Sequence, residues 1–255
     1  MTFPENLHKL GKLAARPGAI SFKFAEYFTA AALPTPPAVF GHYGAVKSWG
    51  VFGNDRYSNC VLAGAAHETM LFTGEAGDVA AFDDSSVLSD YSAITGFSPG
   101  DPNTDQGTDM QAAADYRRKT GLLDAAGNRH IIDAYVALAV GDINELLTAV
   151  NLFGAVGVGI KFPSSAMAQF DAGKPWSVVP GDKVDGGHYI PCLGRAPSGN
   201  FVIVTWGRIH EMEPPFFELY NDENVCYLSL ESLNAKGLSP EGFDMTALST
   251  DLNAL

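Results

Sequence analysis

Cys60 combines a reactive side chain with a position that favours its reactive form. It follows a turn rich in Gly, Asn and Asp and opens an apolar run, Val61 to Phe72, that predicts a buried helix ending at Gly74. Unpaired N–H groups at a helix N-terminus stabilise a thiolate, so a thiol there is a better nucleophile at neutral pH. Cys60 is therefore a candidate nucleophile. The simpler alternative is a thiol buried in the core.

A histidine would complete such a site, because imidazole titrates near neutral pH and can accept and return a proton. His188 begins a predicted strand directly after the turn Asp185-Gly186-Gly187. Two glycines at this point let the backbone approach a neighbouring element or a substrate closely. Cys60 and His188 thus form the candidate catalytic pair.

The other reactive residues have simpler explanations. Cys192 and Cys226 lie in predicted strands and are expected to be core thiols. The pair His67-Glu68 lacks the second histidine of an H-E-x-x-H zinc site, and the loop DPNTDQGTD lacks the spacing of a calcium loop. The segment GVGIKF lacks the third glycine of a dinucleotide-binding turn. We therefore expect no metal and no cofactor.

Helices early in the chain and strands late in it must position these residues. Helices are predicted over residues 61–72, 85–94, 109–120 and 143–150. Strands are predicted in GAVGVGIKF, in a hairpin of HYIPCLGR and NFVIVTWG, and in VCYLSLESL, where a short helix follows. Helices first and an antiparallel sheet later indicate the α+β class.

The order of these motifs resembles that of the papain-like cysteine peptidases. In that family a Gln and a Gly-rich turn precede the Cys that opens a long helix, and a later His begins a strand of a hairpin ending in Asn-Ser-Trp-Gly. Here Asn54 stands six residues before Cys60, and two strands after His188 lead to Thr205-Trp206-Gly207. Between them, DQGTDMQAAADYRRKTGLL and ELLTAVNLFGAVGVGIKFPSSAMAQFDAGKPW resemble the family's Gly-rich turn with its helix and its central strand.

The resemblance covers roughly residues 45–210 and implies a papain-like fold. In that fold a helical subdomain, with a central helix led by Cys60, packs against a C-terminal antiparallel sheet or barrel. Residues 1–45 would be an N-terminal arm or cap and residues 46–255 the domain. The domain would divide into a mainly helical half (46–140), a mainly β half (141–230) and a C-terminal tail (231–255).

The resemblance also implies roles. Cys60 would attack a carbonyl, His188 would pass the proton to the leaving amine, and Asn54 would take the oxyanion-hole position of the family's Gln. An Asn keeps the amide donor on a shorter side chain. A turn-capping Asn is the alternative reading of Asn54. Trp206 is expected to cover His188 as a packing residue.

The residue that orients His188 departs from the family pattern. The family's orienting Asn aligns with Val204, which cannot accept a hydrogen bond from an imidazole. Thr205 is adjacent, but strand alternation predicts that it points to the opposite face. Thr205, after a slip in register, or Asp185 is the substitute that the sequence offers.

Two further departures concern the compartment and regulation. Tyr57 replaces a cysteine that forms a disulfide in the family, and the N-terminus lacks an apolar signal core. These features predict a cytoplasmic protein, or a virion protein if it is phage-encoded, that no signal peptide exports. Residues 1–45 are too short and too apolar for the charged inhibitory prosegment of the family.

The charge balance limits the partners. Against 16 Lys and Arg the chain has 29 Asp and Glu, a formal charge of −13, which argues against nucleic acid and anionic membranes. The acidic residues concentrate at 75–109 and 211–251, which we expect to lie away from Cys60 and His188. A negative surface favours cationic substrates or a basic partner face.

Two functions follow. The first is a thiol hydrolase that cleaves a peptide or amide bond in a protein or peptide substrate. The second is a structural or interaction protein with a peptidase fold and little or no catalysis, assembled with protein partners or with its own copies, as in a phage virion. An open cleft between Cys60 and His188 would favour the first. A cleft covered by residues 1–45 or by a partner would favour the second.

Overall fold

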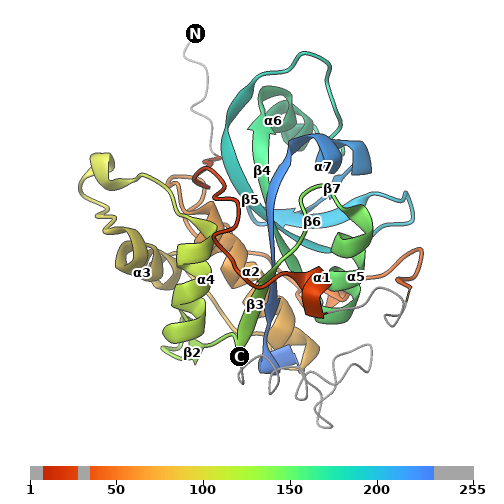
Figure 1. Ribbon diagram of the computed structural model, residues 1–255. Helices are drawn as coiled ribbons and strands as arrows, with labels where there is room; N and C mark the ends of the chain where they lie inside the picture. Colours follow the sequence, from red (N-terminus) through yellow and green to blue (C-terminus); the bar gives the residue numbers. More distant parts are fainter. Residues whose placement is uncertain (1–7, 28–34, 233–255) are drawn as a thin grey trace.

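A six-stranded antiparallel sheet is the centre of the computed structural model, which describes residues 8–27 and 35–232 (Figure 1). Its strand order is β3-β8-β4-β5-β6-β7, and each neighbouring pair is antiparallel. The strands are β3 (Ala134–Ala137), β4 (Val156–Pro163), β5 (Val184–Arg195), β6 (Phe201–Thr205), β7 (Arg208–Met212) and β8 (Asn221–Leu228). A separate two-stranded hairpin is formed by β1 (Leu122–Leu123) and β2 (Arg129–His130).

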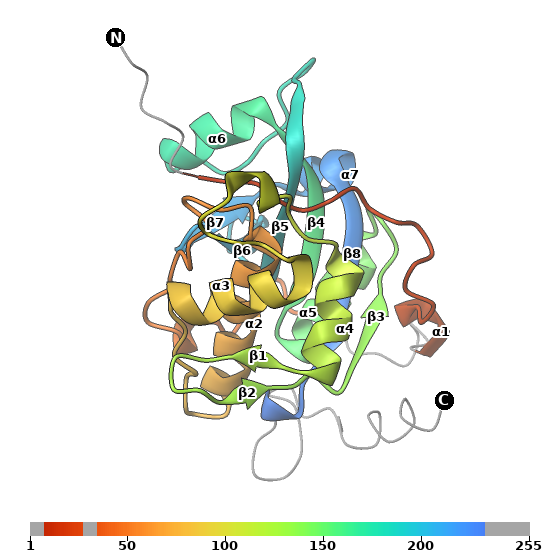
Figure 2. The ribbon, with the colours of Figure 1, turned by 90° about the vertical axis from the view of Figure 1, so that its left-hand side faces the viewer.

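The helices gather mainly on two sides of this sheet. α2, α3 and α4 lie together on one side, and α5 and α7 lie against the strands on the other (Figures 1 and 2). The helices are α1 (Phe24–Tyr27), α2 (Cys60–Glu75), α3 (Asp84–Thr95), α4 (Met110–Lys119), α5 (Ile143–Phe153), α6 (Ser164–Asp171) and α7 (Pro214–Tyr220). Short 3-10 helices occur at η2 (Tyr43–Ala45), η3 (Pro102–Thr104) and η4 (Leu230–Ser232). The predicted α+β class, with a central helix led by Cys60 against an antiparallel sheet, is confirmed.

The central helix α2 is buried on all sides. Every residue from Cys60 to Thr73 is buried, as expected for a helix whose small and apolar residues occupy its whole circumference. The helix continues through Gly74 to Glu75, so the predicted end at Gly74 is wrong by one residue. A Cβ at Gly74 would lie 3.1 Å from a methyl group of Val79, which is a tight contact.

The other predicted helices begin at acidic caps. Asp83, Asp109 and Asp142 precede α3, α4 and α5, and each side chain accepts a hydrogen bond from a backbone N–H in the first turn. These caps explain why the predicted starts agree with the structure to within one residue. The helices α6 and α7 and the strands β1, β2, β3 and β7 were not predicted. The predicted tail, 231–255, lies outside the described residues beyond 232, and the domain division remains a prediction.

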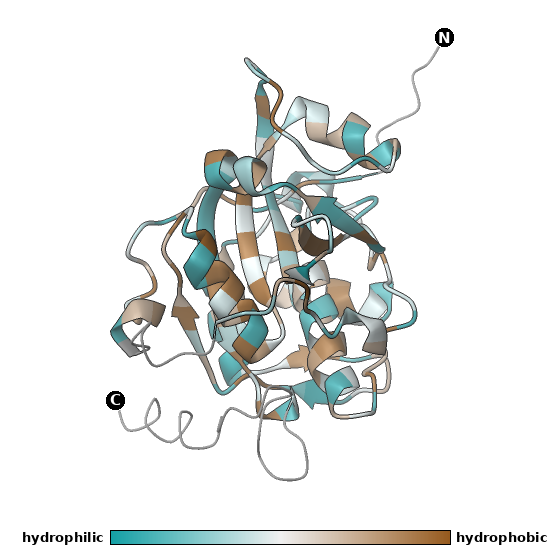
Figure 3. Cartoon of the chain, turned by 90° about the vertical axis from the view of Figure 1, so that its right-hand side faces the viewer, coloured by the Kyte–Doolittle hydropathy of each residue, from teal (hydrophilic) through white to brown (hydrophobic). Residues whose placement is uncertain are grey.

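Strand alternation divides the core into two parts. Along β5, Ile190 and Cys192 face the apolar cluster that includes α5 and α7, whereas Tyr189 and Leu193 face the cluster around α2. The hydropathy view shows hydrophobic and neutral colours along the central strands, while hydrophilic colours gather on loops and outer helix turns (Figure 3). In the described ranges, no helix has the length and apolar character needed to cross a bilayer.

A buried polar cluster joins the helices α2 and α4 to the face of the sheet that they cover. Arg117 of α4 forms an ion pair with Glu68 of α2, and Tyr189 of β5 donates a hydrogen bond of 2.6 Å to the same carboxylate. The Arg117 guanidinium also lies 3.9 Å from the ring centroid of Tyr227 on β8. Four elements therefore meet at one buried carboxylate.

The Arg117→Met variant should lose about 3–5 kcal/mol of unfolding free energy, because it leaves the Glu68 carboxylate buried without its cation. Urea denaturation measures this loss. The double variant Arg117→Met with Glu68→Gln should lose less than the single variant, since no uncompensated charge remains. A double variant that is less stable than the single one would contradict this role of the pair.

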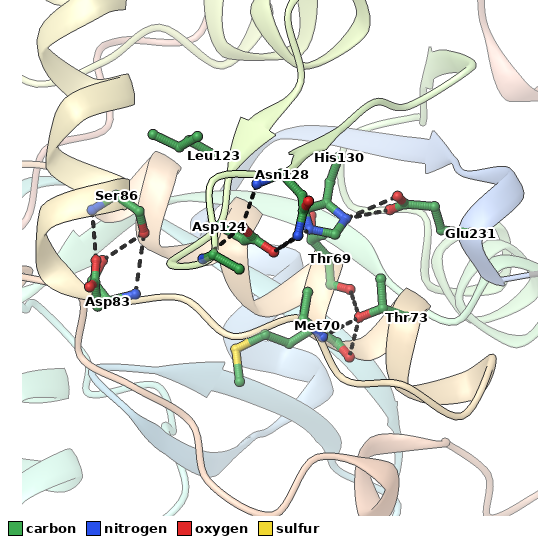
Figure 4. A network of polar contacts seen from close by, with 12 residues as sticks. Thr69, Met70, Thr73, Asp83, Ser86, Leu123, Asp124, Asn128, His130 and Glu231 are labelled. Atoms are coloured by element: carbon green, nitrogen blue, oxygen red, sulfur yellow. Dashed lines mark hydrogen bonds and ion pairs between the residues drawn. The ribbon is translucent and has the colours of Figure 1, made fainter.

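A second polar network attaches η4 to the β1–β2 hairpin (Figure 4). His130 Nδ1 lies 2.9 Å from Glu231, and its Nε2 lies 3.3 Å from Asp124, whose carboxylate also accepts hydrogen bonds from Asn128. The hydrogen bond to Glu231 is the main cause that raises the pKa of His130, against the opposing effect of burial.

A raised histidine pKa stabilises the fold below the unfolded-state pKa, and this stabilisation is lost as the pH rises through the folded-state pKa. The His130→Gln variant should therefore be about 1 kcal/mol less stable than the parent at pH 6. The difference should shrink at pH 9, where His130 is neutral in both states. Urea unfolding of both proteins at the two pH values tests this, and an equal loss at pH 6 and 9 would contradict it.

Candidate active site

Cys60 occupies the first position of α2, but its thiol is covered. The residue is 2% exposed, and burial raises the pKa of the thiol to about 12. Backbone N–H groups of Tyr189, Lys12 and Val61 lie against the sulfur and lower the pKa in part. The expected lowering of the thiol pKa by the helix N-terminus is therefore absent in this covered state, because loss of water outweighs the N–H groups.

His188 on β5 is fully buried and packs against Thr205 and Trp206. Its Nε2 lies 2.8 Å from Thr205 Oγ1, and its ring stacks on the indole of Trp206 with centroids 4.5 Å apart. Burial is the main cause that lowers the pKa of His188 to about 3, so the imidazole is neutral. Its Nδ1 is buried and has no hydrogen-bond partner in the described part of the chain. Because Tyr189 follows His188 and touches the Cys60 sulfur, the start of β5 lies against the start of α2.

Thr205, and not the aligned Val204, faces His188. The pairing of β5 with β6 shifts by one residue between Cys192 and Gly194, so that Cys192 pairs with Ile203. Residues paired across antiparallel strands point to the same face, so the shift places Thr205 on the face of His188 and Val204 on the face of α2. The expectation that Thr205 points away was wrong because the sequence does not reveal this bulge.

The other predicted residues occupy less direct positions. Asp185 accepts a 2.6 Å hydrogen bond from Ser164 at an exposed site, so the contact with His188 is made by Thr205. Asn54 is buried, and its Nδ2 donates to the carbonyl of Tyr57 at 3.0 Å, which matches the turn-capping alternative. One N–H of the amide remains for another acceptor.

Trp206 covers His188 as expected, and its backbone is in the left-handed region with φ of 43°. Its Nε1 donates a 3.0 Å hydrogen bond to the carbonyl of Lys9, and its second face stacks on His8. Such a backbone conformation is costly for a large side chain and persists only where the surroundings hold it. Here stacking on His8 and His188, edge contacts with three further aromatic rings and one hydrogen bond hold it in place.

The segment 8–13, which we call the arm, crosses the site between the helices and the sheet and appears in red in Figures 1 and 2. The N–H groups of Gly11 and Lys12 both lie 3.1 Å from the carbonyl of Gly187, next to His188. On the other side, Thr108 N–H donates to the Gly11 carbonyl at 2.8 Å. The arm is thus held as an extended backbone over Cys60. Residues 1–45 were expected to be an arm or cap, and within them residues 8–13 cover the site.

Glycines make this close approach feasible. A Cβ at Gly187 would lie 2.3 Å from the Lys12 carbonyl oxygen, and one at Gly107 would lie 2.2 Å from the Gly11 oxygen. A Cβ at Gly11 itself would lie 2.0 Å from the Ser58 oxygen, at a φ of +150°. The prediction that the Gly186-Gly187 turn permits a close backbone approach is confirmed.

The side chain of Lys12 fills a small acidic pocket beside the cleft. Its Nζ is fully buried and lies 3.0 and 3.2 Å from the two carboxylate oxygens of Asp222, 3.5 Å from Glu223 and 3.0 Å from the carbonyl of Leu13. The expectation that the acids of 211–251 lie away from the site is therefore wrong for this pair. Nothing in the sequence pointed to these residues, because Lys12 and Asp222 are 210 positions apart.

Among the described residues, no group of three or more His, Cys, Asp or Glu side chains is arranged to hold a metal ion. The site as observed consists of a thiol, a neutral imidazole, a hydroxyl that holds it, and backbone N–H groups. That set can perform nucleophilic and acid–base chemistry on a carbonyl once the arm is displaced.

No family model and no curated protein matches the sequence. Solved structures do match. Xylellain, a cysteine protease from Xylella fastidiosa, aligns with a TM-score of 0.65 at 13% identity over 90% of this chain and 99% of its own. ProCathepsin B S9 from Trypanosoma congolense aligns with a TM-score of 0.62 at 11% identity over 90% and 89% of the two chains. The chain therefore has the papain-like fold of these cysteine proteases.

Proposed function

We propose that the protein is a thiol hydrolase of peptide or related amide bonds, observed in a latent state in which the arm covers the site. The observation that carries the proposal is the extended backbone of Gly11 and Lys12, hydrogen-bonded to Gly187 on one side and to Thr108 on the other, directly over Cys60. A cleft that binds its own chain through backbone groups has the partners that a peptide substrate needs.

The proposed chemistry uses the residues that surround the arm. With Nε2 held by Thr205, the Nδ1 of His188 is the nitrogen left to take the proton of Cys60. The Cys60 sulfur then attacks the carbonyl carbon, and the backbone N–H of Cys60 with the free N–H of Asn54 stabilises the oxyanion. His188 returns the proton to the leaving amine, and water hydrolyses the acyl-thioester.

The second candidate is a protein of an assembly that keeps the fold without catalysis. Two observations favour it: residues 8–13 cover the site, the outcome expected of this candidate, and burial of the pair keeps the Cys60 thiol protonated at neutral pH. If the arm never leaves the cleft, the contact between them serves only to hold the fold together. The two candidates differ in whether displacement of the arm exposes a reactive thiol.

The Lys12→Ala variant should weaken the cover, because it removes the one arm side chain that forms a buried ion pair. We expect iodoacetamide to alkylate Cys60 at least ~10-fold faster in this variant than in the parent, the change expected for loss of about 1.4 kcal/mol from the covered state. Mass spectrometry of the Cys60, Cys192 and Cys226 peptides measures the rates. Cys192 and Cys226 serve as internal controls, since they lie in the core in both proteins.

The same variant should hydrolyse peptide amides, and Cys60→Ser in the Lys12→Ala background should not. Release of a fluorescent amine from a mixture of peptide amides measures this activity. An exposed and reactive Cys60 without Cys60-dependent hydrolysis of any peptide in the mixture would favour the assembly protein.

Thr205→Val in the Lys12→Ala background should lower kcat by about 10-fold, the effect of losing one hydrogen bond of about 1.4 kcal/mol that orients the imidazole. KM should change little, because the hydroxyl acts through its hydrogen bond to the imidazole. Thr205→Ser keeps the hydroxyl and is the matched control. An equal fall in kcat for Ser and Val would show that packing, and not the hydrogen bond, is what matters.

A further inference from the structure

We infer that the pocket beside the cleft, formed by Asp222, Glu223 and Gly159, binds a cationic side chain of the substrate, so that the enzyme prefers peptides with Lys or Arg at this subsite. The inference rests on the proposed function, since it names the substrate class of the same cleft. It starts from the one side chain that the structure shows inside the pocket, Lys12.

The Lys12 ammonium is bound there as a ligand would be. Burial of an ammonium group is costly unless carboxylates and hydrogen-bond acceptors replace its water. Asp222 contributes both oxygens, Glu223 contributes one at 3.5 Å, and the Leu13 carbonyl accepts a further hydrogen bond. The two carboxylates of the pocket therefore supply the charge that replaces water around the ammonium, and the arm's own Leu13 carbonyl supplies one further acceptor.

The wall of the pocket is shaped for the aliphatic part of such a side chain. A Cβ at Gly159 on β4 would lie 2.2 Å from Lys12 Cε, so only glycine leaves this space. The Gly159 carbonyl is turned to Asn221, whose Nδ2 donates to it at 2.9 Å. The space at Gly159 thus lies next to the Asp222 carboxylate, which matches a long side chain with a terminal positive charge.

The backbone contacts connect this pocket to the reacting centre. The N–H of Lys12 donates to the Gly187 carbonyl and is one of the backbone groups that lower the pKa of the Cys60 thiol, so the side chain in the pocket belongs to a residue close to the nucleophile. A peptide that replaces the arm and takes its hydrogen bonds brings one of its own side chains to the same opening.

Displacement of the arm also leaves the carboxylates of the pocket without a counter-ion. Asp222 and Glu223 are 11% and 13% exposed in their side chains and lose their counter-ion when Lys12 leaves. The arm has other attachments, including the hydrogen bonds that the N–H groups of Lys9 and Leu13 donate to the carbonyls of Asn54 and Thr108, so its position does not depend on this pocket alone. A cationic side chain from a substrate restores the lost ion pair, whereas an apolar one leaves both carboxylates unpaired.

The test uses the full chain with Lys12→Ala and two blocked hexapeptides. One peptide has the sequence of residues 8–13, His-Lys-Leu-Gly-Lys-Leu, and the other has norleucine in place of its second lysine. Each peptide is titrated against alkylation of Cys60 by iodoacetamide. We expect the lysine peptide to protect Cys60 at a concentration at least ~10-fold lower than the norleucine peptide.

Two further variants in the same background assign the effect to the pocket. Asp222→Asn with Glu223→Gln removes the charge, and Gly159→Ala narrows the pocket; each should abolish the difference between the peptides. Circular dichroism confirms that each variant is folded. Equal protection by the two peptides in the Lys12→Ala chain overturns the inference, as does a difference that persists in both folded variants.

Protection does not require catalysis, so the two proposals can fail separately. A lysine preference in protection without hydrolysis of any peptide would retain the cationic pocket and reject the enzyme. Hydrolysis with equal kcat/KM for matched lysine and norleucine amides, together with equal protection, would retain the enzyme and reject the pocket. If both proposals are correct, the ratio of kcat/KM for the lysine and norleucine amides should equal the ratio of the concentrations at which the two peptides protect Cys60.

Discussion

The buried carboxylate of Glu68 is the constraint on which the arrangement of the fold depends. It lies in the middle of α2, and its partners come from α4 and β5, with Tyr227 of β8 beside them. An unpaired carboxylate there would be strongly destabilising, so α2 must lie where Arg117 and Tyr189 can reach it. Gly64 and Gly157 leave the room for the Tyr189 side chain, since a Cβ at Gly64 would lie 2.5 Å from its ring and one at Gly157 would lie 2.0 Å from its hydroxyl oxygen.

This cluster also sets the geometry of the candidate site. Tyr189 reaches Glu68 with its hydroxyl and touches the Cys60 sulfur with its backbone N–H. Because side chains alternate along β5, the residue before it, His188, points to the opposite face, where Thr205 and Trp206 hold its ring. The strand β5 therefore presents Tyr189, which binds Glu68, on one face and the imidazole of His188 on the other.

Local signals account for what the sequence predicted. The helix led by Cys60, the acidic caps and the strand after the Gly186-Gly187 turn follow from neighbouring residues, and the papain-like order of motifs gave the class. The residue that orients His188 could not be derived in this way. A one-residue shift in the pairing between Cys192 and Gly194 decides which residues of β6 point to the face of His188. The pocket of Lys12 depends on acids 210 positions away, a distance at which no spacing pattern operates.

The properties of the site and of its cover have one physical origin. Burial is the first cause both of the raised pKa of Cys60 and of the lowered pKa of His188. The arm supplies part of this burial, since Lys12 lies against the sulfur and His8 stacks on the indole that covers His188. The same arm supplies the ammonium that neutralises Asp222 and Glu223. Its departure would therefore hydrate the nucleophile, return both groups towards their ordinary pKa values and leave the acidic pocket ready for a cation, so that activation and substrate choice would depend on a single displacement.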